Sequence, residues 1–213
     1  SKALRAGLFE VQDAGSQKIA PLLQVEPGMR VADTCAGGGG KTLHLAALMG
    51  NKGRLLAMDV HQWKLDELRK RARRAQVDCV ETRLIEGSKT LKRLAGAFDR
   101  VLLDVPCSGL GVVRRNPDAK WKLSLEEIQR LTAVQAEILE GHAKLVRPGG
   151  KLVYATCSIL PAENERQVQR FLAAHPGEWA LEEELHIRTG QPPGSDGFYA
   201  ARLGRKETPP AEG

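Results

Sequence analysis

From Arg30 onward, short apolar runs of strand length alternate with longer segments whose apolar residues recur at helical spacing. This alternation favours a mostly parallel sheet with helices on both faces, because each helix returns the chain to start the next parallel strand. The predicted strands are Arg30–Cys35, Arg54–Asp59, Val80–Ile85, Asp99–Asp104, Lys151–Thr156, Trp179–Ile187 and Gly197–Leu203. The predicted helices are Lys41–Met49, Gln62–Gln76, Ser124–Leu145 and Ala162–Ala174. We expect a doubly wound α/β domain with an antiparallel strand near its C-terminus.

Local signals set the expected ends of the long helix. Ser124-Leu125-Glu126-Glu127 is a capping box, and Pro148-Gly149-Gly150 is expected to separate the helix from the strand that starts at Lys151. The 213 residues suffice for one core, which we place at residues 25–206. Residues 1–24 are expected to be an extension that contributes to this domain, within a longer protein, and residues 207–213 a frayed tail.

Composition narrows the class of protein. No apolar run reaches the length of a membrane helix and no signal segment opens the chain, which predicts a cytoplasmic protein without a membrane partner. The four cysteines have no zinc-site spacing and are sparse for a disulfide scaffold. We therefore expect reduced thiols and no metal; the cysteines are Cys35, Cys79, Cys107 and Cys157.

Basic residues exceed acidic residues by 32 to 26, and their placement is more informative than the total. One group crowds the loop after Cys107 and predicts contact with a phosphate backbone: Arg114, Arg115, Lys120 and Lys122. A second group, between Arg69 and Arg74, surrounds a helix and is interpreted as solvated surface. Trp121 is as easily an anchor for the loop as a platform for a base, so it stays outside the predicted site.

Two predicted strands end in cysteine motifs. One run ends in Asp104-Val105-Pro106-Cys107-Ser108 and the other in Thr156-Cys157-Ser158. Because parallel α/β sheets carry their sites at the carboxyl ends of the strands, both thiols are expected to face one crevice. A lone cysteine is more often a small core residue, but two cysteines at two strand ends, one of them beside Asp104 and Pro106, favour an enzyme.

A glycine-rich turn links the first predicted strand to its helix, in the sequence Asp33-Thr34-Cys35-Ala36-Gly37-Gly38-Gly39-Gly40-Lys41-Thr42. Its backbone can approach a ligand closely at a helix N-terminus. The phosphate-loop pattern would need glycine at Cys35, and the dinucleotide pattern would need one at Thr42, so both are disfavoured. Asp59 ends the next strand, where a carboxylate accepts ribose hydroxyls in related folds, which indicates a nucleoside ligand.

Together these residues resemble the Sun/Fmu, or RsmB-like, family of RNA cytosine C5 methyltransferases, which use S-adenosylmethionine. The matching segments are Phe9 to Gln17, Asp33 to Thr42, Asp104 to Gly109, Arg114 to Trp121, Ala155 to Ser158, Glu163 to Glu165 and Asp196 to Ala200. The resemblance implies a Rossmann-like class I methyltransferase fold. It also implies an RNA substrate, with ribosomal RNA favoured over transfer RNA.

The resemblance assigns roles to particular residues. Cys157 would be the nucleophile, Cys107 would assist product release, and Asp104 would lie between cofactor and base. The cofactor would be held by Cys35, Ala36, Gly37, Gly38, Gly39, Gly40, Lys41, Asp59 and Asp104, and the RNA by Arg114, Arg115 and Lys120. Cytosine methyltransferases that act on DNA use the Pro-Cys cysteine alone, so the presence of both motifs favours RNA.

Two departures from the family pattern stand out. The family usually has Ala-Pro-Gly-Gly-Lys where this chain has Gly37-Gly38-Gly39-Gly40-Lys41, which replaces a rigid loop with a flexible one. The family also commonly has an Asp after the third strand on the adenine side, where Glu86 is the candidate substitute here.

The chemistry explains why a reactive cysteine and a second group are needed. Carbon 5 of cytosine becomes nucleophilic only after a thiolate adds at carbon 6, and a base must then remove the carbon 5 proton. Asp104 is suited to bind the exocyclic amine or, when protonated, to donate to ring nitrogen 3.

Two other classes of protein stay open. One is a non-catalytic RNA-binding module with a degenerate glycine loop. The other is a thiol redox enzyme, although the cysteines form no Cys-x-x-Cys motif.

Overall fold

The structure, a computed structural model, describes residues 1–190 and 194–207. Its first elements are α1 (Lys2–Arg5), the short 3-10 helix η1 (Ser16–Lys18), α2 (Ile19–Leu22), β1 (Arg30–Asp33), α3 (Gly40–Leu48), β2 (Arg54–Asp59), α4 (Gln62–Arg74), β3 (Val80–Leu84) and α5 (Ser88–Lys92). The later elements are β4 (Phe98–Asp104), the 3-10 helix η2 (Leu110–Val112), α6 (Ala119–Lys122), α7 (Leu125–Ala143), β5 (Val146–Thr156), α8 (Glu165–Ala174), β6 (Trp179–Ile187) and β7 (Phe198–Arg205).

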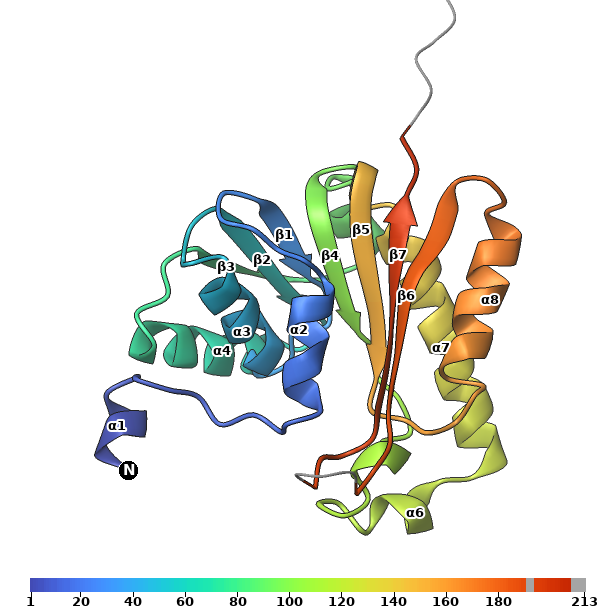
Figure 1. Cartoon of the computed structure of the whole chain (residues 1–213), viewed down its shortest axis with the longest axis horizontal. Coiled ribbons are helices and arrows are strands. Elements are labelled where there is room, and N and C mark those ends of the chain that lie inside the picture. Colours follow the sequence, from blue (N-terminus) through green and yellow to red (C-terminus); the bar gives the residue numbers. More distant parts are fainter. Residues whose placement is uncertain (191–193, 208–213) are drawn as a thin grey trace, which may run out of the picture.

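Within the described residues, seven strands form one sheet in the order β3-β2-β1-β4-β5-β7-β6. The strands from β3 to β5 pair in parallel, and β7 runs antiparallel to both β5 and β6. Helices α2, α3 and α4 cover one face, and α7 and α8 cover the other (Figure 1). The predicted doubly wound α/β fold, with its antiparallel strand near the C-terminus, is confirmed.

Successive residues of β4 show how the sheet joins two cores. Val101 and Leu103 pack with Leu139 of α7 and Phe171 of α8, whereas Leu102 packs on the opposite face with α2 and α3. This alternation follows from the two-residue period of a strand, and the run Val101–Leu103 is apolar and buried because both faces of the sheet are covered there.

The start of β5 differs from the prediction. Helix α7 ends at Ala143, and β5 begins at Val146, before Pro148-Gly149-Gly150 instead of after it. Val146 pairs with Phe98, and the register then shifts before Arg100 pairs with Lys151. The Pro-Gly-Gly segment is thus an irregularity inside a strand, a position where proline is tolerated because ladder bonds are already interrupted.

Other boundaries moved by a few residues. The helix predicted from Ala162 begins at Glu165, and the first strand ends at Asp33 instead of Cys35. Ser124 does cap α7, since its Oγ accepts a hydrogen bond from the Glu127 N–H at 3.2 Å. The short helices α5 and α6 were not predicted. Of the predicted frayed tail, residues 208–213 lie outside the described residues.

Candidate active site

The two cysteine motifs meet because their strands are neighbours. β4 and β5 are parallel, and Asp104 pairs in register with Ala155, so the chain leaves both strands at the same edge of the sheet. The Sγ atoms of Cys107 and Cys157 lie 3.3 Å apart. The two thiols therefore meet as predicted, and the sulfur atoms are close enough to share a proton.

The environment of the pair distinguishes its two members. The hydrogen bond from the Cys107 thiol lowers the pKa of Cys157, and the positive charge of Lys41 lowers it further against the effect of burial. The same hydrogen bond, together with burial, raises the pKa of Cys107 well above its ordinary value. The directions of these two pKa shifts favour Cys157 over Cys107 as the thiolate, the reactive form of cysteine.

Lys41 connects the glycine loop to the cysteine pair. Its Nζ contacts Asp104 Oδ2 at 2.6 Å, with the lysine side chain 12% exposed. Burial alone would lower the pKa of Lys41, but attraction to Asp104 outweighs it and raises that pKa, so the ammonium stays charged. Asp104, at the end of β4, is therefore fixed beside the thiols by a charge from the neighbouring strand's loop.

The glycine loop turns from β1 into α3 with two left-handed residues, Gly37 at φ +52° and Gly39 at φ +87°. A Cβ at Gly39 would lie 2.6 Å from Cγ of Leu68, so this position also needs glycine for its close approach to α4. Behind the loop, Asp33 is buried and its Oδ2 accepts a hydrogen bond from Thr42 Oγ1 at 2.7 Å.

A pocket of about 290 Å³ opens between the glycine loop and the ends of β2 and β4. It is lined by Thr34, Cys35, Gly37, Asp59, Val60, His61, Lys64, Ile85, Asp104, Val105, Pro106, Ile138 and His142. The lining does not include the predicted residues Ala36, Gly38, Gly39, Gly40 and Lys41. Glu86, the candidate substitute on the adenine side, is exposed and outside the lining, which Ile85 occupies.

Asp59 and Asp104 are the acidic residues of the pocket lining, and Asp59 lies at the end of β2. It is 6% exposed, and its two oxygens accept hydrogen bonds from the N–H groups of Gly37, at 3.0 Å, and His61, at 2.9 Å. A carboxylate can accept about four hydrogen bonds, so acceptor capacity is left for a ligand.

Two other residues of the pocket lining are uncharged at pH 7. Burial lowers the pKa of His142 to about 4, so its imidazole ring is neutral. Burial also raises the pKa of the Cys35 thiol, which therefore keeps its proton.

Glu163 is the main site residue that sequence reasoning did not identify as such. It is fully buried, and it accepts hydrogen bonds from Ser108 N at 2.8 Å, Ser108 Oγ at 2.5 Å and Gln135 Nε2 at 2.9 Å. Ser158 Oγ donates to the same carboxylate. One carboxylate therefore ties together the residues that follow both cysteines; the repeated Cys-Ser order was the available signal.

The basic loop after Cys107 is only partly directed outward. Arg115 Nε donates to Asp196 Oδ2 at 2.5 Å, and Asp196 is fully buried beside β7. Arg114 lies 3.9 Å from the same carboxylate, and both arginine side chains remain 57% exposed. Lys120 Nζ lies 4.8 Å from the ring centre of Trp121, which is 79% exposed and so does not anchor the loop by packing.

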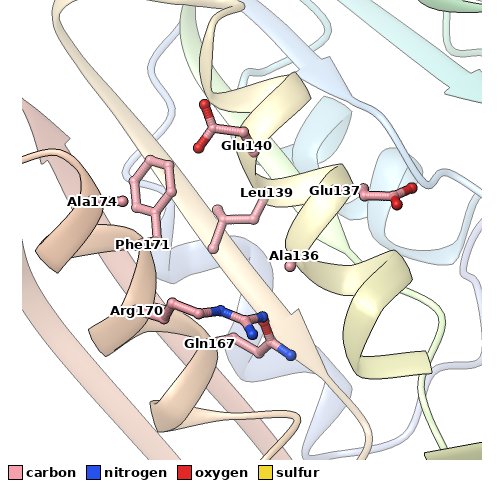
Figure 2. Close-up of a pocket in the computed structure, with 8 residues that line it drawn as sticks. All are labelled: Ala136, Glu137, Leu139, Glu140, Gln167, Arg170, Phe171 and Ala174. Carbon is pink, nitrogen blue, oxygen red and sulfur yellow. The ribbon is translucent and has the colours of Figure 1, made fainter. Parts of the chain in front are cut away.

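A second cavity, of about 330 Å³, lies between α7 and α8 (Figure 2). Leu139 and Phe171 form its apolar wall, and Glu137 and Arg170 stand at its sides. It includes none of the site residues predicted from the sequence. The cavity at the strand ends is therefore the better candidate for the reaction.

In residues 1–190 and 194–207, no three His, Cys, Asp or Glu side chains gather in an arrangement fit for a metal ion. No helix there combines the length and apolarity that crossing a bilayer requires.

Comparison with known proteins places this site in a family. Residues 20–204 match the 16S rRNA methyltransferase RsmB/F family. The chain belongs to this family. It is 42% identical over 182 residues to a probable ribosomal RNA small subunit methyltransferase B of Synechocystis and 38% identical over 207 residues to ribosomal RNA small subunit methyltransferase B of Yersinia pseudotuberculosis. The two matches cover 81% and 94% of the present RsmB/F chain, respectively. They cover only 40% and 48% of the lengths of the two relatives.

Solved structures agree with the RsmB/F assignment. NSun6 from Pyrococcus horikoshii, determined with SFG, matches with a TM-score of 0.87 at 27% sequence identity. The match covers 98% of this chain and 56% of the NSun6 chain. A methyltransferase homolog protein from the same organism matches with a TM-score of 0.80 at 29% sequence identity. This match covers 96% of the present chain and 70% of the homolog chain. The RsmB/F chain thus has the Rossmann-like methyltransferase fold predicted from its sequence.

Proposed function

We propose that this chain is the catalytic domain of an RNA cytosine C5 methyltransferase that acts on ribosomal RNA of the small subunit, with S-adenosylmethionine as methyl donor. The observation that carries the proposal is the pair of thiols 3.3 Å apart beside the Lys41–Asp104 ion pair. Residues 25–206 form the catalytic domain in this proposal, and residues 1–24 complete it. A ribosomal substrate also fits the cytoplasmic location expected from the sequence.

The pocket suits the proposed cofactor. Its volume of about 290 Å³ is near the lower end of ligand pockets. Asp59 retains acceptor capacity for ribose hydroxyls, and the glycine loop exposes backbone close to the strand ends. The fit is supported by the relative that was determined with SFG, an analogue of S-adenosylmethionine. When bound, S-adenosylmethionine supplies an electrophilic methyl group.

Cys157 starts the reaction in this proposal. Its thiolate adds to carbon 6 of cytosine, a sulfur–carbon bond forms, and the electron pair of the carbon 5–carbon 6 double bond becomes available at carbon 5. The lowered pKa of Cys157 supports this role, because it increases the thiolate fraction near neutral pH. Asp104, held by Lys41 through Oδ2, orients the base by accepting a hydrogen bond from its exocyclic amine.

Cys107 acts when the product leaves. A base removes the proton from carbon 5, the carbon 5–carbon 6 double bond forms again, and Cys157 departs from carbon 6 as a thiolate. The Cys107 thiol, whose pKa is raised, keeps its proton and donates a hydrogen bond to the departing sulfur. Product release is thereby made easier, since the charge that develops on Cys157 is stabilised.

The RNA contacts follow from the basic loop. A cytosine must leave its stack to reach Cys157, at a cost of roughly a few kcal/mol. Phosphate contacts from Arg114 and Lys120 offset this cost, and exposed Trp121 offers a surface for stacking. Arg115 contributes less charge to RNA than the sequence predicted, because its guanidinium pairs with buried Asp196.

The test is transfer of labelled methyl from S-adenosylmethionine to unmodified small-subunit ribosomal RNA and to transfer RNA, followed by nucleoside analysis. We expect 5-methylcytidine in ribosomal RNA with the wild-type chain and none with Cys157→Ala. Product in transfer RNA alone would contradict the substrate, and full activity of Cys157→Ala would contradict the nucleophile. Absence of both product and cofactor binding would instead favour a non-catalytic RNA-binding module.

A further inference from the structure

The loop of four consecutive glycines from Gly37 to Gly40 must be held in one conformation if it is to shape a binding site. Glycine loses more conformational freedom on ordering than any other residue, so a loop of four needs external contacts to hold one shape. One contact is internal to the pocket, where Gly37 N–H donates to Asp59 Oδ2 at 3.0 Å. The next residue, Gly38, stands where the family usually has proline.

The carbonyl oxygen of Gly38 is held from outside the loop. Arg71, on α4, donates from its guanidinium to this oxygen at 2.6 Å. The second terminal nitrogen of Arg71 donates to Glu10 Oε2 at 2.9 Å. A charged donor makes a stronger hydrogen bond than a neutral one, and its fixed fork geometry restrains the group it binds.

Glu10 is held in turn at both of its oxygens. Arg74, one turn further along α4, pairs with Oε1, while Arg71 pairs with Oε2. The side chains of Glu10 and Arg71 are each 20% exposed. Burial alone would raise the pKa of Glu10, but its hydrogen bonds with Arg74 and Arg71 lower that pKa and keep the carboxylate charged.

Apolar packing does not explain why the N-terminal segment lies here. The neighbouring side chains Leu8 and Val11 are 77% and 75% exposed, and Phe9 is 47% exposed. A cavity of about 350 Å³ lies between this segment and α3, with Glu10 and Gly40 both in its lining. The ion pairs of Glu10 are therefore the contacts that fasten residues 8–11 behind the glycine loop.

We propose that Glu10 and Arg71 form a clamp that holds the flexible glycine loop in its cofactor-binding shape, in place of the rigidity that proline gives the family. Arg71 is a positioning residue, since it acts through the Gly38 carbonyl. The clamp rests on the proposed function, because the loop it orders is the proposed cofactor loop. It also corrects the interpretation of Arg71 and Arg74 as part of a solvated surface.

The test uses Arg71→Met, which keeps the aliphatic stem and removes the donors. We expect faster hydrogen exchange of residues 36–41 without ligand. We also expect affinity for S-adenosylhomocysteine, measured by calorimetry, to fall about tenfold, a typical cost of one charged hydrogen bond. Arg73→Met is the matched control, because Arg73 is exposed on the same helix, and it should leave both quantities unchanged.

Two further variants separate the clamp from general destabilisation. Glu10→Gln breaks the clamp from its other end and should weaken binding in the same direction. Gly38→Pro restores the family residue, and in the Arg71→Met background it should recover most of the lost affinity, because it restricts the loop directly. The N–H that proline removes has no partner recorded among the described residues.

The outcomes distinguish this proposal from the proposed function. Equal exchange and affinity in Arg71→Met and Arg73→Met would overturn the clamp, and so would a Gly38→Pro, Arg71→Met double variant that stays as weak as Arg71→Met. Failure of the wild-type chain to bind S-adenosylhomocysteine would overturn the proposed function. In that event, hydrogen exchange of the ligand-free loop still decides whether the clamp exists.

Discussion

Cys107 and Cys157 have the same chemistry in isolation and acquire different properties through one contact. The 3.3 Å approach of their sulfurs lets the Cys107 thiol stabilise a thiolate on Cys157. Lys41 adds a positive charge on the Cys157 side. In the proposed mechanism, the difference between nucleophile and helper therefore follows from position and not from residue type.

The first prediction removes this contact with Cys107→Ala. The pH midpoint for alkylation of Cys157 by iodoacetamide should shift upward, because the thiolate loses its hydrogen-bond donor. With RNA and cofactor present, a complex of protein and RNA that survives denaturation should accumulate, since attack proceeds while release is slowed. An unchanged alkylation midpoint, measured by mass spectrometry against the wild-type chain, would contradict the shared proton.

Asp33 shows how burial at a single residue makes stability depend on pH. Burial raises its pKa from 3.8 to about 7, against the hydrogen bond from Thr42. Within the described residues its Oδ1 has no hydrogen-bond partner, and Lys41 and Asp104 are its charged neighbours. The folded chain therefore keeps this proton up to about pH 7, whereas the unfolded chain loses it near pH 4, so the contribution of Asp33 to stability falls across that interval.

The second prediction is that Asp33→Asn raises the melting temperature at pH 8 and changes it little at pH 5. Asparagine is uncharged at both values, and its carbonyl can still accept from Thr42. Differential scanning calorimetry of both chains at the two pH values measures the difference. An equal shift at pH 5 and pH 8 would show that the charge of Asp33 is not the cause.

At the scale of elements, the site depends on how α7 and α8 hold the ends of β4 and β5. Gln135 of α7 donates to the Pro106 carbonyl at 3.0 Å as well as to Glu163. Asn164, which directly precedes α8, donates from its side-chain amide to the Ser158 carbonyl at 3.0 Å. The two cysteine loops are thus braced from the helix side of the sheet, and Glu163 is the group on which both converge.

The third prediction concerns Glu163→Gln, which preserves volume but removes an acceptor for buried donors. We expect a loss of about 1–3 kcal/mol in the free energy of unfolding, because at least one buried donor loses its partner. The alkylation midpoint of Cys157 should also rise as the sulfurs separate. Urea unfolding and alkylation measure these effects. Glu165→Gln, at the start of α8, is the control and should change neither.

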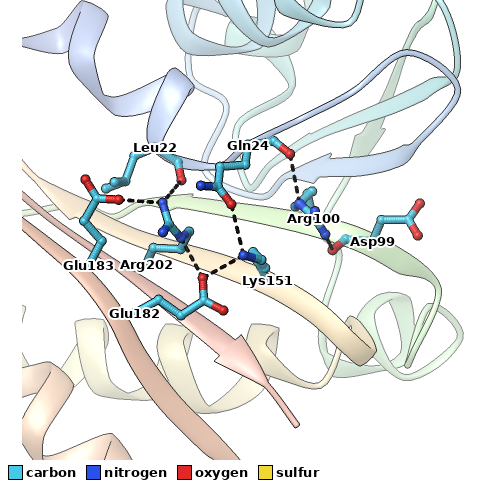
Figure 3. A network of polar contacts seen from close by, with 8 residues as sticks. All are labelled: Leu22, Gln24, Asp99, Arg100, Lys151, Glu182, Glu183 and Arg202. Carbon is cyan, nitrogen blue, oxygen red and sulfur yellow. Dashed lines mark hydrogen bonds and ion pairs between the residues drawn. The ribbon is translucent and has the colours of Figure 1, made fainter. Parts of the chain in front are cut away.

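At the scale of the whole molecule, a polar network connects the N-terminal segment to the far strands (Figure 3). Arg202 of β7 is buried and donates to the Leu22 carbonyl at 3.1 Å, to Glu182 at 2.7 Å and to Glu183 at 2.8 Å. Lys151 of β5 bonds both Glu182 and Gln24. The segment before β1 is thereby held against three strands of the sheet.

The fourth prediction is that Arg202→Met lowers the free energy of unfolding by about 1–3 kcal/mol, since the buried Leu22 carbonyl loses its donor. Urea unfolding followed by circular dichroism measures the change. The control is Arg54→Met, whose ion pair with Glu81 is largely exposed and should cost less than about 1 kcal/mol. Equal effects of the two substitutions would show that the hydrogen bonds of Arg202 do not stabilise the fold more than an exposed ion pair does.

The sequence by itself determined the order of the strands and of the longer helices α3, α4, α7 and α8 along the chain, because the periodicity that distinguishes them is visible within a few neighbouring residues. It also located Cys107, Cys157 and Asp59, since each directly follows or ends an apolar run and parallel strands end at one edge. It did not predict that β5 starts at Val146, because that start depends on pairing with Phe98 of another strand.

Only the tertiary structure decided which side chains contact each other across long intervals of sequence. Lys41 reaches Asp104, Ser108 reaches Glu163 and Arg115 reaches Asp196, and in each case the partners lie on different elements. Such contacts depend on strand register and helix placement, which no local pattern records. The local sequence therefore indicated which residues belong to the site. The packing of the fold decided which of these residues contact each other, and these contacts lower the pKa of Cys157.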